Sequence, residues 1–292
     1  MVGRRFTWVR PADVVMIPPV ANNFVAGETA AEAIEHARGL ERRGVGTILN
    51  LLGEHYGDPA DAAADTAVYG NVVERLSSVD ADACVSVKPS QIGLDVSEAL
   101  FRENLDSIVD VADEHGTFVW IDMEDHTTTD ATLDAYEHHA RGTDGNVGVC
   151  VQSNLKRTRG DLERLAALPG KVRLVKGAYD PPREIAYQDR ERVDRAYRED
   201  LEFAFEAFEG GVAVGSHDPA MIDRARELHA EYDTGFEIQM LMGVREDAQT
   251  ELAREYPVYQ YVPYGRKWFS YFYRRLRERR RNALFALRAL VD

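Results

Sequence analysis

Five short apolar runs in this chain each end on a polar or charged side chain. The runs CVSV, TFVWI, VGVCV, VRLV and VAVGS are followed by Lys88, Asp122, Gln152, Lys176 and His217. Apolar runs of this length are typical of buried strands, and helical patterns separate them. In a (βα)8 barrel the carboxyl ends of all the strands meet at one face and build the active site. The pattern therefore predicts a TIM-type α/β barrel with a functional site at that face.

Eight strand and helix pairs can be traced along the chain. The expected strands lie near 46–52, 84–88, 117–122, 147–152, 172–176, 212–216, 236–241 and 258–262. The expected helices lie near 59–76, 96–114, 129–141, 159–168, 190–209, 218–231, 246–255 and 267–290, the last of them over the active site. Thr29 is placed to cap an earlier helix over 30–43 outside the barrel. Because no composition break divides the chain, we expect a helical extension over 1–44 and one catalytic barrel over 45–292.

The composition argues against several classes of protein. A formal net charge of -15 argues against nucleic acid as a partner, because binding phosphates requires a basic face. No apolar run reaches the ~18 residues of a membrane span, and the N-terminus lacks an export signal, which favours a cytoplasmic location. Cys84 and Cys150 lack metal or disulfide spacing and are expected to be small core residues. Scarce lysine and abundant carboxylates resemble proteins of salt-loving organisms.

The run VRLVKGAY over 172–179 places two charges in apolar surroundings. Arg173 and Lys176 fall on opposite faces of the strand, so only one of them can point fully into the barrel. A buried charge needs a partner, and either a carboxylate on a neighbouring strand or an anionic ligand would serve. Gly177 and Ala178 are small enough for backbone amides to approach a phosphate or a flat ring.

Two loops bear on the kind of ligand. The segment DMEDH over 122–126 carries oxygen donors that could bind a metal ion. The other strand ends supply Lys, Gln and Arg instead, so we expect no metal at this site. His217 can serve as a base or as a hydrogen-bond donor, while Asp218 caps the following helix with Pro219 in its first turn.

The C-terminal segment YVPYGRKWFSYFYRRLRE over 261–278 combines tyrosines with arginines. On a helix, Tyr271 and Arg275 are neighbours one turn apart, as are Arg274 and Glu278. Arginines beside tyrosines suit a small carboxylate with an apolar body. An amphipathic outer helix with solvated charges is the alternative, and the basic run over 274–281 is also compatible with peripheral membrane contact.

Eight strings, in order along the chain, carry a resemblance to a known family. They are FVAGET, LNLLGE, SVKPSQIGL, WIDMED, VRLVKGAY, GSHD, FEIQMLMGVR, and YVPYG with RRLRE. Together they resemble the motifs of FAD-dependent proline dehydrogenases, and the chain is similar in length to the monofunctional members. The resemblance implies oxidation of L-proline to Δ1-pyrroline-5-carboxylate by hydride transfer to FAD. It further implies that electrons pass to a membrane quinone in the first step of proline catabolism.

The resemblance also implies a role for each matching residue. The substrate carboxylate would be bound by Lys88, Arg274 and Arg275, with Asp122 balancing Lys88. The pyrrolidine ring would be wrapped by Ala178, Leu241, Tyr261 and Tyr271. Arg173 would lie near the reactive nitrogen of the flavin, where a fixed positive charge stabilises the reduced anion. FAD would contact Met123, Gln152, Lys176, Gly177, Ala178, Ser216 and His217, with Glu278 near its adenylate portion.

The chain departs from the family pattern at two positions on the cofactor side, and other functions stay open. Asp180 stands where an aromatic residue is frequent, and Ser216 stands where threonine is common, so the affinity for FAD and its pose are open. One alternative is a barrel lyase or aldolase with Lys88 or Lys176 as a Schiff-base amine. Another is a non-catalytic barrel that binds flavin or an amino acid. The quinone, the oligomeric state and a preference for proline over hydroxyproline are likewise open.

Overall fold

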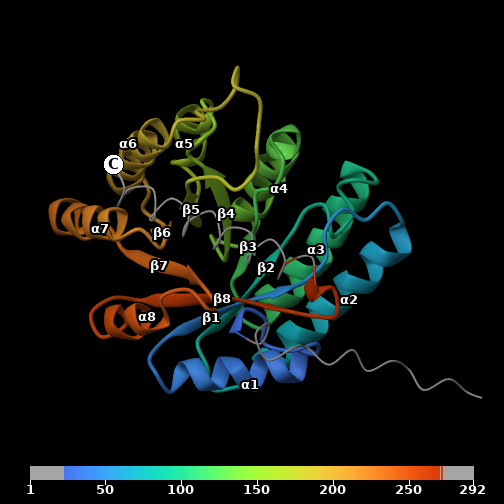
Figure 1. Ribbon diagram of the computed structural model, residues 1–292. Helices are drawn as coiled ribbons and strands as arrows, with labels where there is room; N and C mark the ends of the chain where they lie inside the picture. Colours follow the sequence, from blue (N-terminus) through green and yellow to red (C-terminus); the bar gives the residue numbers. More distant parts are fainter. Residues whose placement is uncertain (1–22, 270, 272–292) are drawn as a thin grey trace, which may run out of the picture.

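The computed structural model describes residues 23–269 and residue 271, in which eight parallel strands close into a barrel (Figure 1). The strands are β1 Gly46–Leu51, β2 Ala83–Val87, β3 Val119–Ile121, β4 Val147–Gln152, β5 Lys171–Val175, β6 Val212–Gly215, β7 Phe236–Leu241 and β8 Val258–Tyr264. Each strand pairs with the next along the chain, and β8 closes the barrel on β1 over six register pairs from Gly46 with Tyr259 to Leu51 with Tyr264. The predicted TIM-type barrel is confirmed.

The helices form a ring around the strands (Figure 1). They are α1 Ala30–Glu41, α2 Pro59–Leu76, α3 Glu98–Glu114, α4 Thr129–Gly142, α5 Thr158–Leu165, α6 Arg190–Ala207, α7 Pro219–Tyr232 and α8 Glu246–Leu252, with a short 3-10 turn, η2 His126–Thr128. The predicted bounds agree within a few residues. The helix predicted to 168 ends at Leu165, because the chain turns there toward Gly170, whose φ of 107° suits only glycine well. The helix predicted over 267–290 lies outside the described residues except for its first residues.

Helix α1 begins where the sequence predicts. The Thr29 hydroxyl accepts the amide of Glu32 at 3.3 Å, and the Glu32 carboxylate accepts the amide of Thr29 at 2.9 Å. This reciprocal pair is a capping box, which satisfies two amides that a helix start leaves free. The helix packs on β1 and β8 and lies in the ring between α2 and α8 (Figure 1). It therefore covers the strands at which the barrel closes.

The alternation of side chains along the strands divides the interior into two cores. Outward residues of the strands, among them Leu49, Val85, Val149 and Leu174, pack against the helices. A smaller cluster of Ile48, Cys84, Trp120 and Ala213 fills the barrel itself. Gly148 makes room for the indole of Trp120, because a Cβ at that position would lie 2.4 Å from the ring. Trp120 is thus the main filler of the barrel interior, and polar side chains continue toward its carboxyl face.

Both cysteines are buried and free, as predicted. Burial raises the pKa of Cys150 to about 11, so its thiol is protonated at neutral pH.

Among the helices that the structure describes, none has both the length and the apolar character needed to cross a membrane.

Candidate active site at the carboxyl face of the barrel

The carboxylate of Asp122 is the centre of the polar cluster at the carboxyl ends of the strands. Its Oδ1 atom accepts hydrogen bonds from Ser86 Oγ at 2.8 Å and from Arg173 Nη1 at 2.7 Å. Its Oδ2 atom accepts from Lys88 Nζ at 2.8 Å and from the Tyr261 hydroxyl at 2.6 Å. Asp122 follows β3, whereas its partners come from β2, β5 and β8. A single buried carboxylate therefore ties together strands from both sides of the barrel.

The charges in this cluster stabilise one another. Burial would raise the pKa of Asp122, but Lys88 and Arg173 outweigh it and hold that pKa below its usual value. Burial would lower the pKa of Lys88, but the Asp122 carboxylate outweighs it and holds that pKa well above its usual value. The pKa of Tyr261 is raised well above its usual value, first by burial and then by the Asp122 charge. The carboxylate and the ammonium are thus charged and the phenol is neutral, as a hydrogen-bond donor must be.

Arg173 points into the barrel, where only 4% of its surface is exposed. Its guanidinium lies over the Trp120 ring at 4.4 Å, a cation–π contact. One nitrogen is bound to Asp122, but Nε and Nη2 have no acceptor among the residues that the structure describes. A buried donor without an acceptor costs about 1–3 kcal/mol. Water or a ligand can supply the missing acceptor, and the polar edge of a flat ring or a carboxylate fits these donors.

Lys176 points away from Arg173, as the alternation of side chains predicts. Its ammonium binds Asp194 on α6 and Asp218 at 2.7 Å. Asp218 also accepts the amide of Ala220 at 3.1 Å, which confirms the predicted cap of α7 with Pro219 in the first turn. Lys176 is therefore held by two carboxylates beside the mouth of the barrel.

The loops after β4 and β5 lie together beside Arg173. The Gln152 side chain donates to the carbonyl of Glu124 at 2.8 Å and accepts the amide of Ala178 at 3.4 Å. Gly177 has a φ of 109°, and a Cβ there would lie 2.3 Å from the Asn154 side chain. The need for a small residue at this position is confirmed. Ala178 itself is exposed.

Other predicted contact residues lie around the same face. Met123 is buried directly after Asp122. His217 Nε2 accepts the amide of Leu241 at 3.3 Å, so the loop after β6 is tied to the end of β7. The hydroxyl of Ser216 accepts the amide of Asp218 at 3.2 Å. The strand ends thus bring together the residues predicted for the site, apart from those on the last helix.

The C-terminal residues of the predicted site are described only in part. Tyr271 is buried and packs in one cluster with Phe24, Leu52 and Trp268. Arg274, Arg275 and Glu278 lie outside the described residues. Their predicted roles therefore stay predictions.

Sequence reasoning missed three members of the site. Ser86 and Trp120 lie two residues before Lys88 and Asp122, on the same faces of their strands, so the period of two could have found them. Glu124 was considered only as a possible metal ligand. Its carboxylate instead accepts both the amide of Ser90 at 2.7 Å and the Ser90 hydroxyl at 2.8 Å.

The Glu124–Ser90 contact joins three loops at the carboxyl face. The Ser90 hydroxyl accepts the amide of His55 at 3.0 Å, and the Ser90 carbonyl accepts the amide of Tyr56 at 3.1 Å. Burial raises the pKa of Glu124, although Lys88 and Ser90 oppose the shift. Ser90 therefore joins the loop that begins at Lys88 to the loop after β1 through its own contacts and to the loop after β3 through Glu124.

Comparison with known proteins gives a consistent result. A family model described as proline dehydrogenase matches residues 33–288. A proline dehydrogenase of Deinococcus radiodurans is 38% identical over 285 residues, which cover 93% of this chain and 90% of its own. Proline dehydrogenase 1 of Bacillus subtilis is 33% identical over 276 residues with the same two coverages.

Larger bifunctional proteins match over part of their length. The bifunctional protein PutA of Escherichia coli is 27% identical over 184 residues, 55% of this chain and 14% of that protein. The crystal structure of proline utilization A from Bdellovibrio bacteriovorus, inactivated by N-propargylglycine, superimposes with a TM-score of 0.81. It is 21% identical, and the match covers 88% of this chain and 32% of that one. At this identity the superposition supports the barrel fold alone.

Proposed function

Because the chain belongs to the proline dehydrogenase family, we propose that it oxidises L-proline to Δ1-pyrroline-5-carboxylate with FAD as the hydride acceptor. One structural observation carries the proposal. Asp122 binds Lys88, Arg173 and Tyr261 at the carboxyl face, and Arg173 keeps two donor atoms without acceptors among the described residues. The arrangement places two fixed cations beside a partly exposed tyrosine. The cations suit a carboxylate and the polar edge of a flat cofactor, and the tyrosine suits a small apolar ring.

The residues around Arg173 fit a flavin. FAD, when bound, would supply the acceptor for the hydride. Nε and Nη2 of Arg173 would donate to the ring, and a fixed guanidinium there would stabilise negative charge on it. The other proposed contacts are Met123, Gln152, Lys176, Gly177, Ala178, Ser216 and His217, with Glu278 near the adenylate portion. Each of these except Glu278 lies in the described carboxyl-face loops or strand ends.

The substrate site is proposed beside the Oδ2 atom of Asp122, which binds Lys88 and Tyr261. Lys88, Arg274 and Arg275 would bind the carboxylate of proline, while Ala178, Leu241, Tyr261 and Tyr271 would enclose its ring. Asp122 holds the Lys88 ammonium and the Tyr261 hydroxyl on one oxygen atom, Oδ2, and so sets their spacing. This rigid pair would orient the substrate with its amine deprotonated, which is the form that can lose hydride from the neighbouring carbon.

The contacts of Lys88 and Lys176 argue against the lyase alternative. A Schiff-base lysine must be a neutral amine, which an apolar pocket or a neighbouring cation favours. Lys88 is paired with Asp122, and its pKa is raised rather than lowered. Lys176 is paired with two carboxylates. Neither side chain has the surroundings that amine catalysis requires.

We propose a membrane quinone as the final electron acceptor, reached from the cytoplasmic side by peripheral contact. The basic run over 274–281 supports this proposal, because clustered arginines are attracted to anionic lipid. The resemblance to quinone-linked members of the family is its other support.

The proposed activity is tested by recording the visible spectrum of the FAD-loaded protein without oxygen. We expect L-proline to bleach the flavin band and a soluble quinone to restore it, because FAD, when bound, would accept the hydride and a quinone would take up the two electrons. A protein that stays colourless after incubation with FAD would contradict the cofactor. A yellow protein that proline cannot bleach would indicate a different substrate or a binding role.

Replacing Arg275 with methionine is expected to raise the KM for proline about 10- to 150-fold with FAD still bound. This range corresponds to the roughly 1.5–3 kcal/mol of a hydrogen bond to a charged group. The measurement is steady-state kinetics with flavin content determined in parallel. Arg266→Met removes an exposed arginine earlier in the same segment of the sequence and is the control. An unchanged KM would remove Arg275 from the carboxylate site.

A further inference from the structure

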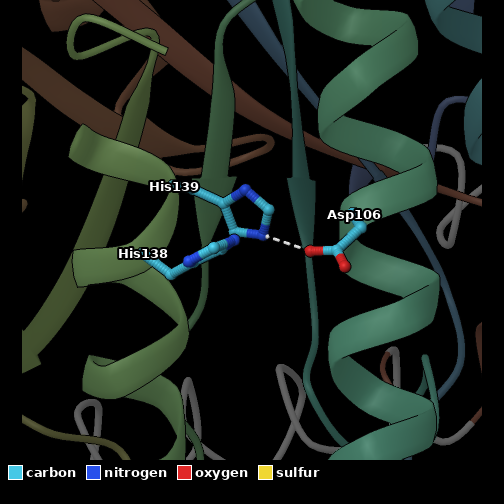
Figure 2. Close-up of side chains that lie close together, drawn as sticks. All are labelled: Asp106, His138 and His139. Atoms are coloured by element: carbon cyan, nitrogen blue, oxygen red, sulfur yellow. Dashed lines mark ion pairs between the residues drawn. The ribbon is translucent and has the colours of Figure 1, made fainter. Parts of the chain in front are cut away.

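Three potential metal ligands meet on the outer layer of helices, away from the Asp122 cluster. Asp106 lies on α3, and His138 and His139 lie on α4; Figure 2 shows all three side chains in the space between these helices. His139 Nε2 lies 3.1 Å from Asp106 Oδ1, and the centroids of the two imidazole rings are 5.1 Å apart. One ligand atom from each residue lies within 4.8 Å of the other two.

We propose that Asp106, His138 and His139 bind a divalent transition-metal ion of the zinc class. Two imidazoles with one carboxylate form a donor set typical of zinc, whereas magnesium and calcium prefer oxygen ligands. At Zn–N and Zn–O distances of about 2.0–2.2 Å in tetrahedral geometry, ligand atoms lie roughly 3.3 Å apart. The Asp106–His139 pair is already close to this spacing, so small side-chain rotations would complete a three-ligand site.

The site combines a fixed ligand with open ones. His139 is 6% exposed, so packing between the helices restricts its ring. Asp106 and His138 are exposed, which leaves a path for the ion and room for a water ligand. Preorganisation of one ligand reduces the entropy lost when the others close on the ion.

The electrostatic surroundings favour a cation. Asp110, one turn beyond Asp106 on α3, adds a second negative charge that acts on His139. The formal net charge of the chain is -15. A hydrogen bond from His139 to Asp106 alone would explain that pair without a metal ion, but it gives no role to His138. A metal site requires His138, whereas a simple hydrogen-bonded pair of His139 and Asp106 does not, so a variant of His138 distinguishes the two explanations.

The test is a titration of the tag-free, FAD-loaded protein with zinc chloride in an isothermal calorimeter. We expect one zinc ion per chain, and a rise in melting temperature because the ion joins α3 to α4 in the folded state only. His138→Ala and Asp106→Asn should each weaken binding at least about tenfold, since each removes a ligand. Both side chains are exposed, so neither change should disturb folding. Cobalt(II) should give the absorption of a tetrahedral site in the parent protein but in neither of these two variants.

His115→Ala is the matched control, because His115 is an exposed histidine at the end of α3 outside the cluster. Its zinc binding should equal that of the parent protein. Absence of stoichiometric zinc binding would overturn the proposal, as would equal binding by the parent protein and His138→Ala. Loss of binding in His115→Ala would place the ion elsewhere and overturn it as well. Flavin reduction should be the same with and without zinc.

Discussion

Replacing Asp122 with asparagine is expected to lower the free energy of unfolding by about 3–5 kcal/mol and to abolish proline oxidation. The substitution leaves Lys88 and Arg173 buried without the carboxylate that neutralises them, and breaking a buried ion pair from one side has roughly this cost. The amide NH2 group would also face two of the four donors that now bind the carboxylate. Denaturant unfolding and anaerobic flavin reduction measure the two effects.

The control for this prediction is Asp95→Asn. Asp95 pairs with His55 at 2.8 Å on the surface, where an ion pair contributes at most about 1 kcal/mol. We expect the control to unfold at nearly the parental denaturant concentration and to keep its activity. If Asp122→Asn behaved like the control, the central role of this carboxylate would be wrong.

The pH dependence of stability gives a second test of the role of Asp122, with the same Asp122→Asn variant. The pKa of Asp122 lies below its usual value in the folded protein. Its contribution to stability is therefore complete above the unfolded pKa of about 3.9 and is lost as the pH falls through the lower folded value. The parent protein should lose this part of its stability in acid. Asp122→Asn should lack that component of the acid transition.

Replacing Arg173 with methionine is expected to slow flavin reduction by proline on the order of 10²- to 10³-fold. A methionine fills similar space but removes the positive charge and the two free donors that face the proposed flavin. Removing one preorganised donor to developing charge has an effect of this size in other enzymes. Stopped-flow reduction without oxygen gives the rate, and the absorbance ratio of the purified protein gives the flavin content.

Two further variants make the Arg173 prediction specific. Arg173→Lys keeps a charge but not the planar group that binds Asp122 and covers Trp120, so we expect only partial recovery. Arg141→Met removes an exposed arginine paired with Glu137 and should reduce its flavin at the parental rate. A parental rate in Arg173→Met would show that this guanidinium does not act on the flavin.

Much of the fold could be predicted because its signals are local. Strand runs, helix periods and caps such as Thr29 and Asp218 depend on neighbours within a few residues. The alternation of side chains along a strand likewise predicted that Arg173 and Lys176 lie on opposite faces. The family motifs added predicted roles for residues that are far apart in the chain.

The partners of the charged residues could not be predicted in this way. Asp122 binds Lys88, Arg173 and Tyr261, which are 34, 51 and 139 residues away. Whether Arg173 would pair with a protein carboxylate or with a ligand was open, and the structure shows one nitrogen on Asp122 with two donors left over. The approach of Asp106 to His138 and His139 likewise has no spacing motif, because it depends on how two helices pack.

The sequence by itself determined the order and type of the elements, the face at which the polar residues gather, and the family. Backbone hydrogen bonds and side-chain alternation act over short distances, so their pattern is present in the linear chain. Only the tertiary structure decided which charges neutralise one another and which donors stay available for a ligand. Those contacts form across a closed barrel, where one-residue changes in register move a side chain to the other face of its strand.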